Sequence, residues 1–176
     1  GRVYQTLNTI GSKNLSGYQR QTVSVGGVTL SVKGFIANGT AYLPFRAAAS
    51  AILGSSYNYT SENKTSVMTA KGLEITASDG CYVTYANGRT LFSTTPNVIM
   101  NDGGLYIPAT VFAKAVGMSL DVGTSYTTID GSYNPLISAD KFYREDEVFW
   151  LARIIHAESK GEPLLGQIAV GNVVLN

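Results

Sequence analysis

The feature that most constrains this fold is a stretch of sequence that occurs twice. The first copy reads GTAYLPFRAAASAILG and the second reads GGLYIPATVFAKAVG. Each copy holds a tyrosine, a proline and a final glycine at similar positions, namely Tyr42, Pro44, Gly54, Tyr106, Pro108 and Gly117. Because proline suits the start of a helix and glycine suits its end, each copy predicts a strand, a helix and a stop. A short alternating segment follows each glycine and predicts one further strand.

Two hairpin signals add to this repeat. Gly26-Gly27 and Asn87-Gly88 each separate two alternating runs, and glycine and asparagine accept the positive φ of tight hairpin turns. Two further strands are expected on either side of Lys71-Gly72. We therefore expect residues 22–132 to form an α+β domain of antiparallel hairpins in two similar halves, with two short helices on one face. Residues 1–21 show no clear period and predict a lead-in or linker that holds no more than one edge strand.

The composition excludes several classes of protein. Charged residues make up 14% of the 176 residues, and the formal net charge is +1, so nothing indicates binding to nucleic acid. No apolar run is long enough to span a bilayer. A single cysteine excludes an internal disulfide framework. Low charge and many Ser, Thr and Tyr residues suit a secreted protein of a Gram-positive cell surface.

The C-terminal part has a different pattern. Residues 133–142 predict a linker, and residues 143–176 predict a helical segment. Acidic residues crowd the start of its first helix, where they favour the positive end of the helix dipole. An i, i+3, i+4, i+7 apolar stripe follows at Val148, Leu151, Ala152 and Ile155. Gly161 and Pro163 predict the end of this helix.

Glu158 is the candidate catalytic residue. It lies three residues after Ile155 and seven after Leu151, which places it on the face of the apolar stripe. We therefore expect its side chain to be partly buried, which would favour the protonated form that a general acid needs. On spacing alone, Glu158 could instead only cap the helix or pair with Arg153 or Lys160.

Residues 22–132 resemble the copper amine oxidase N-terminal-like domain of secreted Firmicute proteins, through YLPFRAAASAILG and YIPATVFAKAVG. The resemblance implies a non-catalytic surface module that acts as a spacer or binds the cell wall. It does not imply copper, because the chain has one His and one Cys, whereas copper sites use several imidazoles or thiolates. We expect no cofactor and no metal site.

The segment from Phe149 onward is similar to the opening of the cell wall hydrolase family that includes the spore cortex-lytic enzymes. That family has a helix ending in (Gly/Ala)-Glu-(Ala/Ser)-x-Gly-Glu-Pro, followed by a second helix of Gly-Gln-x-Ala-Val type that runs into Val-Leu-Asn. The matching residues are Ala157, Glu158, Gly161, Glu162, Pro163, Gly166, Gln167, Ala169, Val170 and Asn176. The resemblance implies that Glu158 is the acid that cleaves peptidoglycan between N-acetylmuramic acid and N-acetylglucosamine. Ser159 stands where Ala is commoner.

Two functions are therefore compared. The first is a secreted peptidoglycan glycosidase or lytic transglycosylase that acts on glycan strands, with an N-terminal wall-binding module. The second is a non-catalytic surface or scaffold module. Because the family's catalytic domain is far longer than residues 143–176, we expect an incomplete domain that is inactive by itself. We also expect Val173, Val174 and Leu175 to pack on the N-terminal domain, to mediate self-association through the C-terminal helix, or to be flexible.

Overall fold

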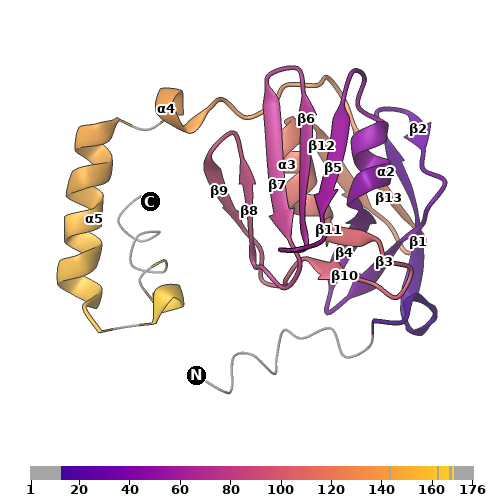
Figure 1. The fold of residues 1–176 in the computed structure, drawn as a ribbon, viewed down its shortest axis with the longest axis horizontal. Helices are drawn as coiled ribbons and strands as arrows, with labels where there is room; N and C mark the ends of the chain where they lie inside the picture. The colour runs from indigo at the N-terminus through magenta and orange to yellow at the C-terminus, as the bar shows by residue number, and fades with distance from the viewer. Residues whose placement is uncertain (1–12, 143, 162, 167, 169–176) are drawn as a thin grey trace. The chain divides into compact units, whose positions relative to one another are not determined.

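The structure is a computed structural model, which describes residues 13–142, 144–161, 163–166 and 168. The chain divides into two compact units, Gly1–Ile137 and Ser138–Asn176 (Figure 1). The described residues form a mixed α+β structure with mostly antiparallel sheets and a C-terminal helical segment, as the sequence predicted.

The first unit contains two sheets among the described residues. The larger has the strand order β10-β11-β4-β3-β1-β13-β12, and β2 pairs with β1. Its strands are β1 (Gln19–Val25), β2 (Val28–Thr29), β3 (Gly34–Ala37), β4 (Thr40–Pro44), β10 (Val98–Ile99), β11 (Leu105–Pro108), β12 (Ser119–Val122) and β13 (Tyr126–Asp130). One pair departs from the expected antiparallel pattern, because β1 and β13 are parallel. A parallel pair needs a long connection, and here most of the domain lies between the two strands.

The smaller sheet is an antiparallel meander in the order β5-β6-β7-β8-β9. Its strands are β5 (Ser56–Thr60), β6 (Thr65–Ala70), β7 (Leu73–Ser78), β8 (Val83–Ala86) and β9 (Arg89–Phe92). The two predicted hairpins are present, with β1 and β2 joined at Gly26-Gly27 and β8 and β9 at Asn87-Gly88. The strands predicted about Lys71-Gly72, β6 and β7, also pair as a hairpin. Asn87 and Gly88 have φ of 51° and 75°, as a type I′ turn requires.

Two helices follow the repeated tyrosine-proline strands. α2 (Phe45–Ser50) comes after β4, and α3 (Ala109–Val116) comes after β11. α3 contacts β4, β11 and β12 of the larger sheet and β7 of the smaller one, so it lies between the two sheets (Figure 1). Gly117 ends α3 in the left-handed conformation, as predicted. α2 instead ends at Ser50, earlier than the expected stop at Gly54, and the chain reaches Gly54 through a turn.

The two halves meet at the pairing of β4 with β11. In this register Leu43 lies opposite Ile107, and Tyr42 lies opposite Pro108. Leu43 and Ile107 are also equivalent residues of the sequence repeat. An approximate twofold axis therefore passes between Leu43 and Ile107 and relates one half of the repeat to the other. The predicted internal similarity is confirmed for the strand–helix–strand order, although β5 joins the smaller sheet and β12 joins the larger.

Side chains cover both faces of the β4–β11 pair. On one face Leu43 and Ile107 join a core that includes both helices and strands of both sheets. On the other face Tyr42 and Tyr106 form a second cluster around Phe35, whose ring stacks on that of Tyr42 at 4.9 Å and tilts toward that of Tyr106 at 5.2 Å. All four of the central residues of the pair are fully buried. These strands are therefore the centre of the first unit.

The hydroxyl groups of the two buried tyrosines have separate acceptors. Tyr42 donates to the Pro96 carbonyl at 2.7 Å, and Tyr106 donates to Asp102 at 2.8 Å. Burial raises the pKa of the Tyr42 phenol to about 12. Burial, followed by the hydrogen bond to the Asp102 carboxylate, raises the pKa of Tyr106. Both repeated tyrosines are thus structural.

The domain extends beyond the boundaries that the sequence suggested. Before residue 22, Leu15 is buried in the second cluster, and β1 begins at Gln19. After residue 132, the backbone N–H groups of Asn134 and Leu136 donate to Val116 and Ala115, so this stretch is not a free linker. Asn87 donates to the Leu136 carbonyl at 2.6 Å. The segment 133–137 is thereby fixed across α3 and the β8–β9 turn.

The second unit contains α4 (Ala139–Phe142) and α5 (Glu145–Ser159). α5 has fifteen residues and includes all residues of the predicted apolar stripe. Arg144 precedes its first turn and pairs with Glu147 at 3.5 Å. The chain turns after Lys160 at Gly161, whose φ is 95°, so the predicted end of the helix is confirmed. Val173, Val174 and Leu175 lie outside the described residues.

Leu43→Ala should lower the free energy of unfolding of the first unit by about 2–5 kcal/mol, because it leaves a cavity where the two halves meet. The matched control is Leu53→Ala, since Leu53 is 97% exposed and should lose less than about 0.5 kcal/mol. Urea unfolding at neutral pH measures both. Equal losses for the two variants would contradict the central role of the β4–β11 pair.

Alkaline pH should destabilise the first unit through Tyr42. Because its folded pKa of about 12 exceeds the unfolded value of 10.0, the stabilisation is complete below pH 10 and is lost as the pH rises toward 12. Tyr42→Phe should lower stability by about 1 kcal/mol at pH 8 and weaken this pH dependence. Urea unfolding between pH 8 and 11.5 tests it, with Tyr85→Phe as the control because Tyr85 is half exposed. An unchanged slope in Tyr42→Phe would refute the assignment.

Candidate functional site

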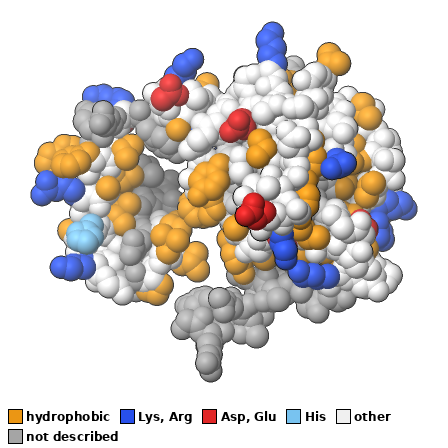
Figure 2. All heavy atoms as spheres, in the orientation of Figure 1, with side chains coloured by type: hydrophobic (Ala, Val, Ile, Leu, Met, Phe, Trp, Pro, Cys, Tyr) orange, Lys and Arg blue, Asp and Glu red, His pale blue; other side chains and the backbone are white. Residues whose placement is uncertain are grey.

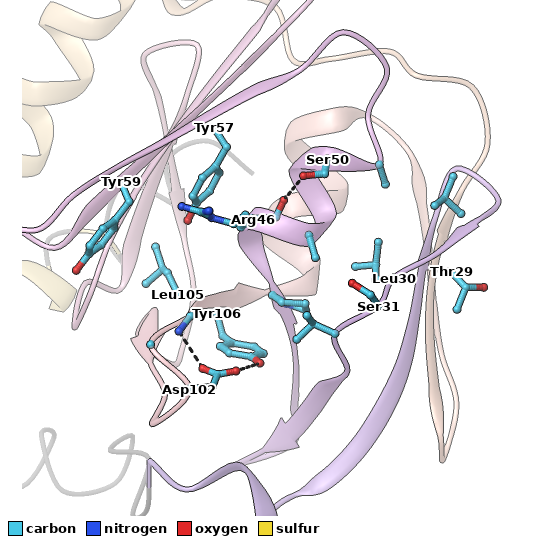
Figure 3. A pocket seen from close by; sticks show the side chains of 17 residues that line it. Thr29, Leu30, Ser31, Arg46, Ser50, Tyr57, Tyr59, Asp102, Leu105 and Tyr106 are labelled. Atoms are coloured by element: carbon cyan, nitrogen blue, oxygen red, sulfur yellow. Dashed lines mark hydrogen bonds between the residues drawn. The ribbon is translucent and has the colours of Figure 1, made fainter.

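A groove on the first unit is one candidate site. Its volume is about 680 Å³, and it lies over α2 between β5 on one side and the segment from β2 to Val32 on the other (Figure 3). The turn of residues 102–104 before β11 lines it as well. The groove thus brings together segments that are far apart in the sequence. The repeat did not predict it.

Arg46 and Tyr57 form the best-defined part of the groove. The guanidinium group of Arg46, on the first turn of α2, lies 5.1 Å from the ring centroid of Tyr57 on β5. The Tyr57 ring is held on its other sides, because its hydroxyl donates to Ser66 at 2.6 Å and it meets Phe45 edge-on at 5.3 Å. Burial raises the pKa of the Tyr57 phenol, and the Ser66 hydrogen bond and Arg46 lower it to a smaller extent. Tyr57 is therefore a fixed aromatic surface.

The carboxylate in the groove is already engaged. One oxygen of Asp102 accepts from the Gly104 backbone N–H at 2.9 Å, and the other accepts from the Tyr106 hydroxyl at 2.8 Å (Figure 3). Among the described residues Arg46 forms no ion pair with this or any other acid. Its guanidinium N–H groups therefore stay available to a ligand.

Glu158, the residue singled out by the sequence, lies at the other candidate site. It is the second-to-last residue of α5, and its side chain is exposed, so the expected partial burial is wrong. The covered residue is the next one, Ser159, which is 1% exposed and donates its hydroxyl to the Ile155 carbonyl. Spacing places a residue on a helix face, but it does not show what packs there. No described basic side chain pairs with Glu158, so the predicted local pairing with Arg153 or Lys160 is absent from this part of the chain.

Apolar side chains also lie at the surface of α5 (Figure 2). They are Val148, Phe149, Trp150 and Ile154, each more than 40% exposed. The guanidinium of Arg153 lies 5.5 Å from the Phe149 ring and 5.7 Å from the Trp150 ring. Arg153 is thus engaged by aromatic rings and not by Glu158.

The remaining candidates do not form a site. His156 is exposed on α5. Cys81, the one cysteine of the chain, is exposed and precedes β8. In the described residues no three His, Cys, Asp or Glu side chains lie close enough to hold a metal ion. None of the described helices is long and apolar enough to cross a membrane.

Comparison with known proteins gives one match. No curated protein and no solved structure matches the chain. A family model described as copper amine oxidase N-terminal domain matches residues 23–130, which is more than half of the chain and includes both copies of the repeat and the lining of the groove. The chain therefore belongs to the copper amine oxidase N-terminal domain family.

Proposed function

We propose that the protein is a secreted enzyme of the bacterial cell wall, which cleaves peptidoglycan glycan strands with Glu158 as general acid. The first unit is its wall-binding module. The observation that carries the proposal is the position of Glu158, which is exposed at the end of a fifteen-residue helix just before the turn at Gly161. An acid in this position is accessible to a polymer. Its motif, AESKGEP, resembles that of cell wall hydrolases.

The proposed chemistry needs one proton donor. The carboxyl of Glu158 gives its proton to the glycosidic oxygen, and the bond from that oxygen to the sugar C1 breaks. In lytic transglycosylation a hydroxyl of the same sugar attacks C1, and its proton returns to Glu158. Hydrolysis instead uses water and, in general, a second carboxylate. The proposal covers the peptidoglycan of the vegetative wall and that of the spore cortex as substrates.

Glu158→Gln should lower glycan cleavage by about 10²–10⁴-fold, because the amide keeps the size of the carboxyl but cannot donate its proton. Folding should be nearly unchanged, since Glu158 is exposed. The assay measures soluble muropeptides released from purified peptidoglycan by the natural protein that contains this sequence.

Glu147→Gln is the matched control. Glu147 is an exposed carboxylate on the same helix, and it pairs with Arg144 across 3.5 Å. The control should retain wild-type cleavage. Wild-type cleavage by Glu158→Gln, or an equal loss in both variants, would rule out Glu158 as the acid.

A scaffold that self-associates through its C-terminal segment is the second candidate. The exposed Phe149 and Trp150 on α5 favour it, because apolar side chains at a surface gain free energy when a partner covers them. The apparent mass of the 176-residue chain should then rise with concentration in light scattering, and Trp150→Ser should reduce the rise. A monomer at all concentrations would exclude this candidate.

A further inference from the structure

We propose that the groove over α2 binds an acidic glycan, with a sugar ring against Tyr59 and a sugar carboxylate on Arg46, which lies over the ring of Tyr57. The proposal assigns a ligand to the first unit. Its choice of peptidoglycan as the glycan rests on the proposed function. The binding itself depends only on the residues of the groove.

The first argument is the state of Arg46. Its guanidinium carbon lies 5.1 Å from the centroid of the Tyr57 ring, and it has no acidic partner among the described residues. Its N–H groups can therefore bind a carboxylate through two parallel hydrogen bonds. An exposed arginine is ordinarily mobile, whereas this one is oriented by the ring before any ligand arrives. The groove is therefore suited to a carboxylate.

The second argument is the pair of tyrosines. Tyr59 lies two residues after Tyr57 on β5, so both side chains point to the same face of the strand, and both line the groove (Figure 3). Tyr57 is fixed by Ser66 and Phe45, whereas Tyr59 is 41% exposed. The C–H face of a sugar ring packs on the face of an aromatic ring. Because Arg46 lies over the Tyr57 ring, the exposed Tyr59 ring is the surface available to a sugar next to the carboxylate.

The remaining lining supports a hydroxyl-rich ligand. Thr29, Ser31 and Ser50 also line the groove, and the Ser50 hydroxyl donates to the Arg46 carbonyl at 2.9 Å (Figure 3). Asp102 cannot compete as the partner of Arg46, because the two are not within ion-pair distance and its oxygens accept from Gly104 and Tyr106. The groove thus offers a stacking surface, hydroxyl groups and one unpaired cation.

An extended peptide is the alternative ligand. β5 is at the edge of the smaller sheet in the described structure, and an added strand could pair with its backbone. Such a peptide would lie along the edge of the sheet, whereas Tyr57 and Tyr59 point from its face. It would therefore not depend on Arg46 or on the Tyr59 ring, which separates the two ligands by experiment.

The test uses the 176-residue chain and three probes in calorimetry. The probes are amidase-treated peptidoglycan glycan strands, which carry carboxylates, chito-oligosaccharides, which have the same type of backbone without carboxylates, and free stem peptides. The acidic strands should bind about tenfold more tightly than the neutral ones. Arg46→Gln should abolish this preference, and Arg46→Lys should restore part of it. Tyr59→Ala should weaken binding of both glycans.

The controls are an arginine and a tyrosine outside the groove. Arg153→Gln removes an arginine that also stacks on aromatic rings, and Tyr85→Ala removes a half-exposed tyrosine of the same sheet. Neither should change binding. An equal loss in Arg153→Gln would place the site on the second unit. Binding of stem peptides that tolerates Arg46→Gln, or no binding of any probe, would also overturn the proposal.

The proposals for the groove and for the cleavage site can be rejected independently of each other. Glu158→Gln should leave glycan binding by the chain unchanged. Intact binding together with unaffected cleavage in Glu158→Gln would reject the proposed function and keep the groove. Lost cleavage without binding of glycan by the 176-residue chain would reject the groove and keep the function.

Discussion

The pairing of β4 with β11 is the contact on which the rest of the first unit depends. These two strands are buried on both faces. Leu43 and Ile107 lie opposite each other at the approximate twofold axis that relates the two halves. A strand pair covered on both sides contributes to two cores at once. Each strand also leads directly into a helix, so the same pairing positions α2 and α3 on one side of the sheet. Tyr42 and Tyr106 close the opposite side.

The groove exists because the two halves differ after their helices. α3 is followed by β12, which stays in the larger sheet, and the helix is covered by β7 from the smaller sheet. α2 is followed by β5, which leaves the larger sheet and begins the smaller one. The outer side of α2 is consequently open between β5 and the β1–β2 hairpin. An arginine on that side, at position 46, faces the groove, whereas most of α3 is buried. The two similar halves form the scaffold, and the difference between them after α2 and α3 leaves the groove open.

The features that the sequence predicted well are local ones. Asn87-Gly88 and Gly26-Gly27 specify their turns through φ alone, and Gly117 specifies the end of α3. The features that were missed depend on contacts between distant residues. Nothing near Asn134 shows that its N–H will bond to Val116, and nothing near Arg46 shows that Tyr57 will lie over it. The prediction that Glu158 is buried was wrong for the same reason. The helix period fixes the face on which a side chain lies, but the residues that cover this face come from elsewhere in the chain.

The two proposed sites make different demands on a polymer ligand, and their chemistry reflects this. A binding module for a polymeric substrate gains most when its own affinity is modest, since tethering raises the effective concentration of the reacting bond while release stays fast. One oriented arginine and two tyrosines, one of them exposed, provide a modest affinity of this kind. An acid such as Glu158 needs the reverse, a brief and close contact with one glycosidic oxygen at an accessible position. Glu158 is exposed at the end of α5, where the proposed general acid could make such a contact.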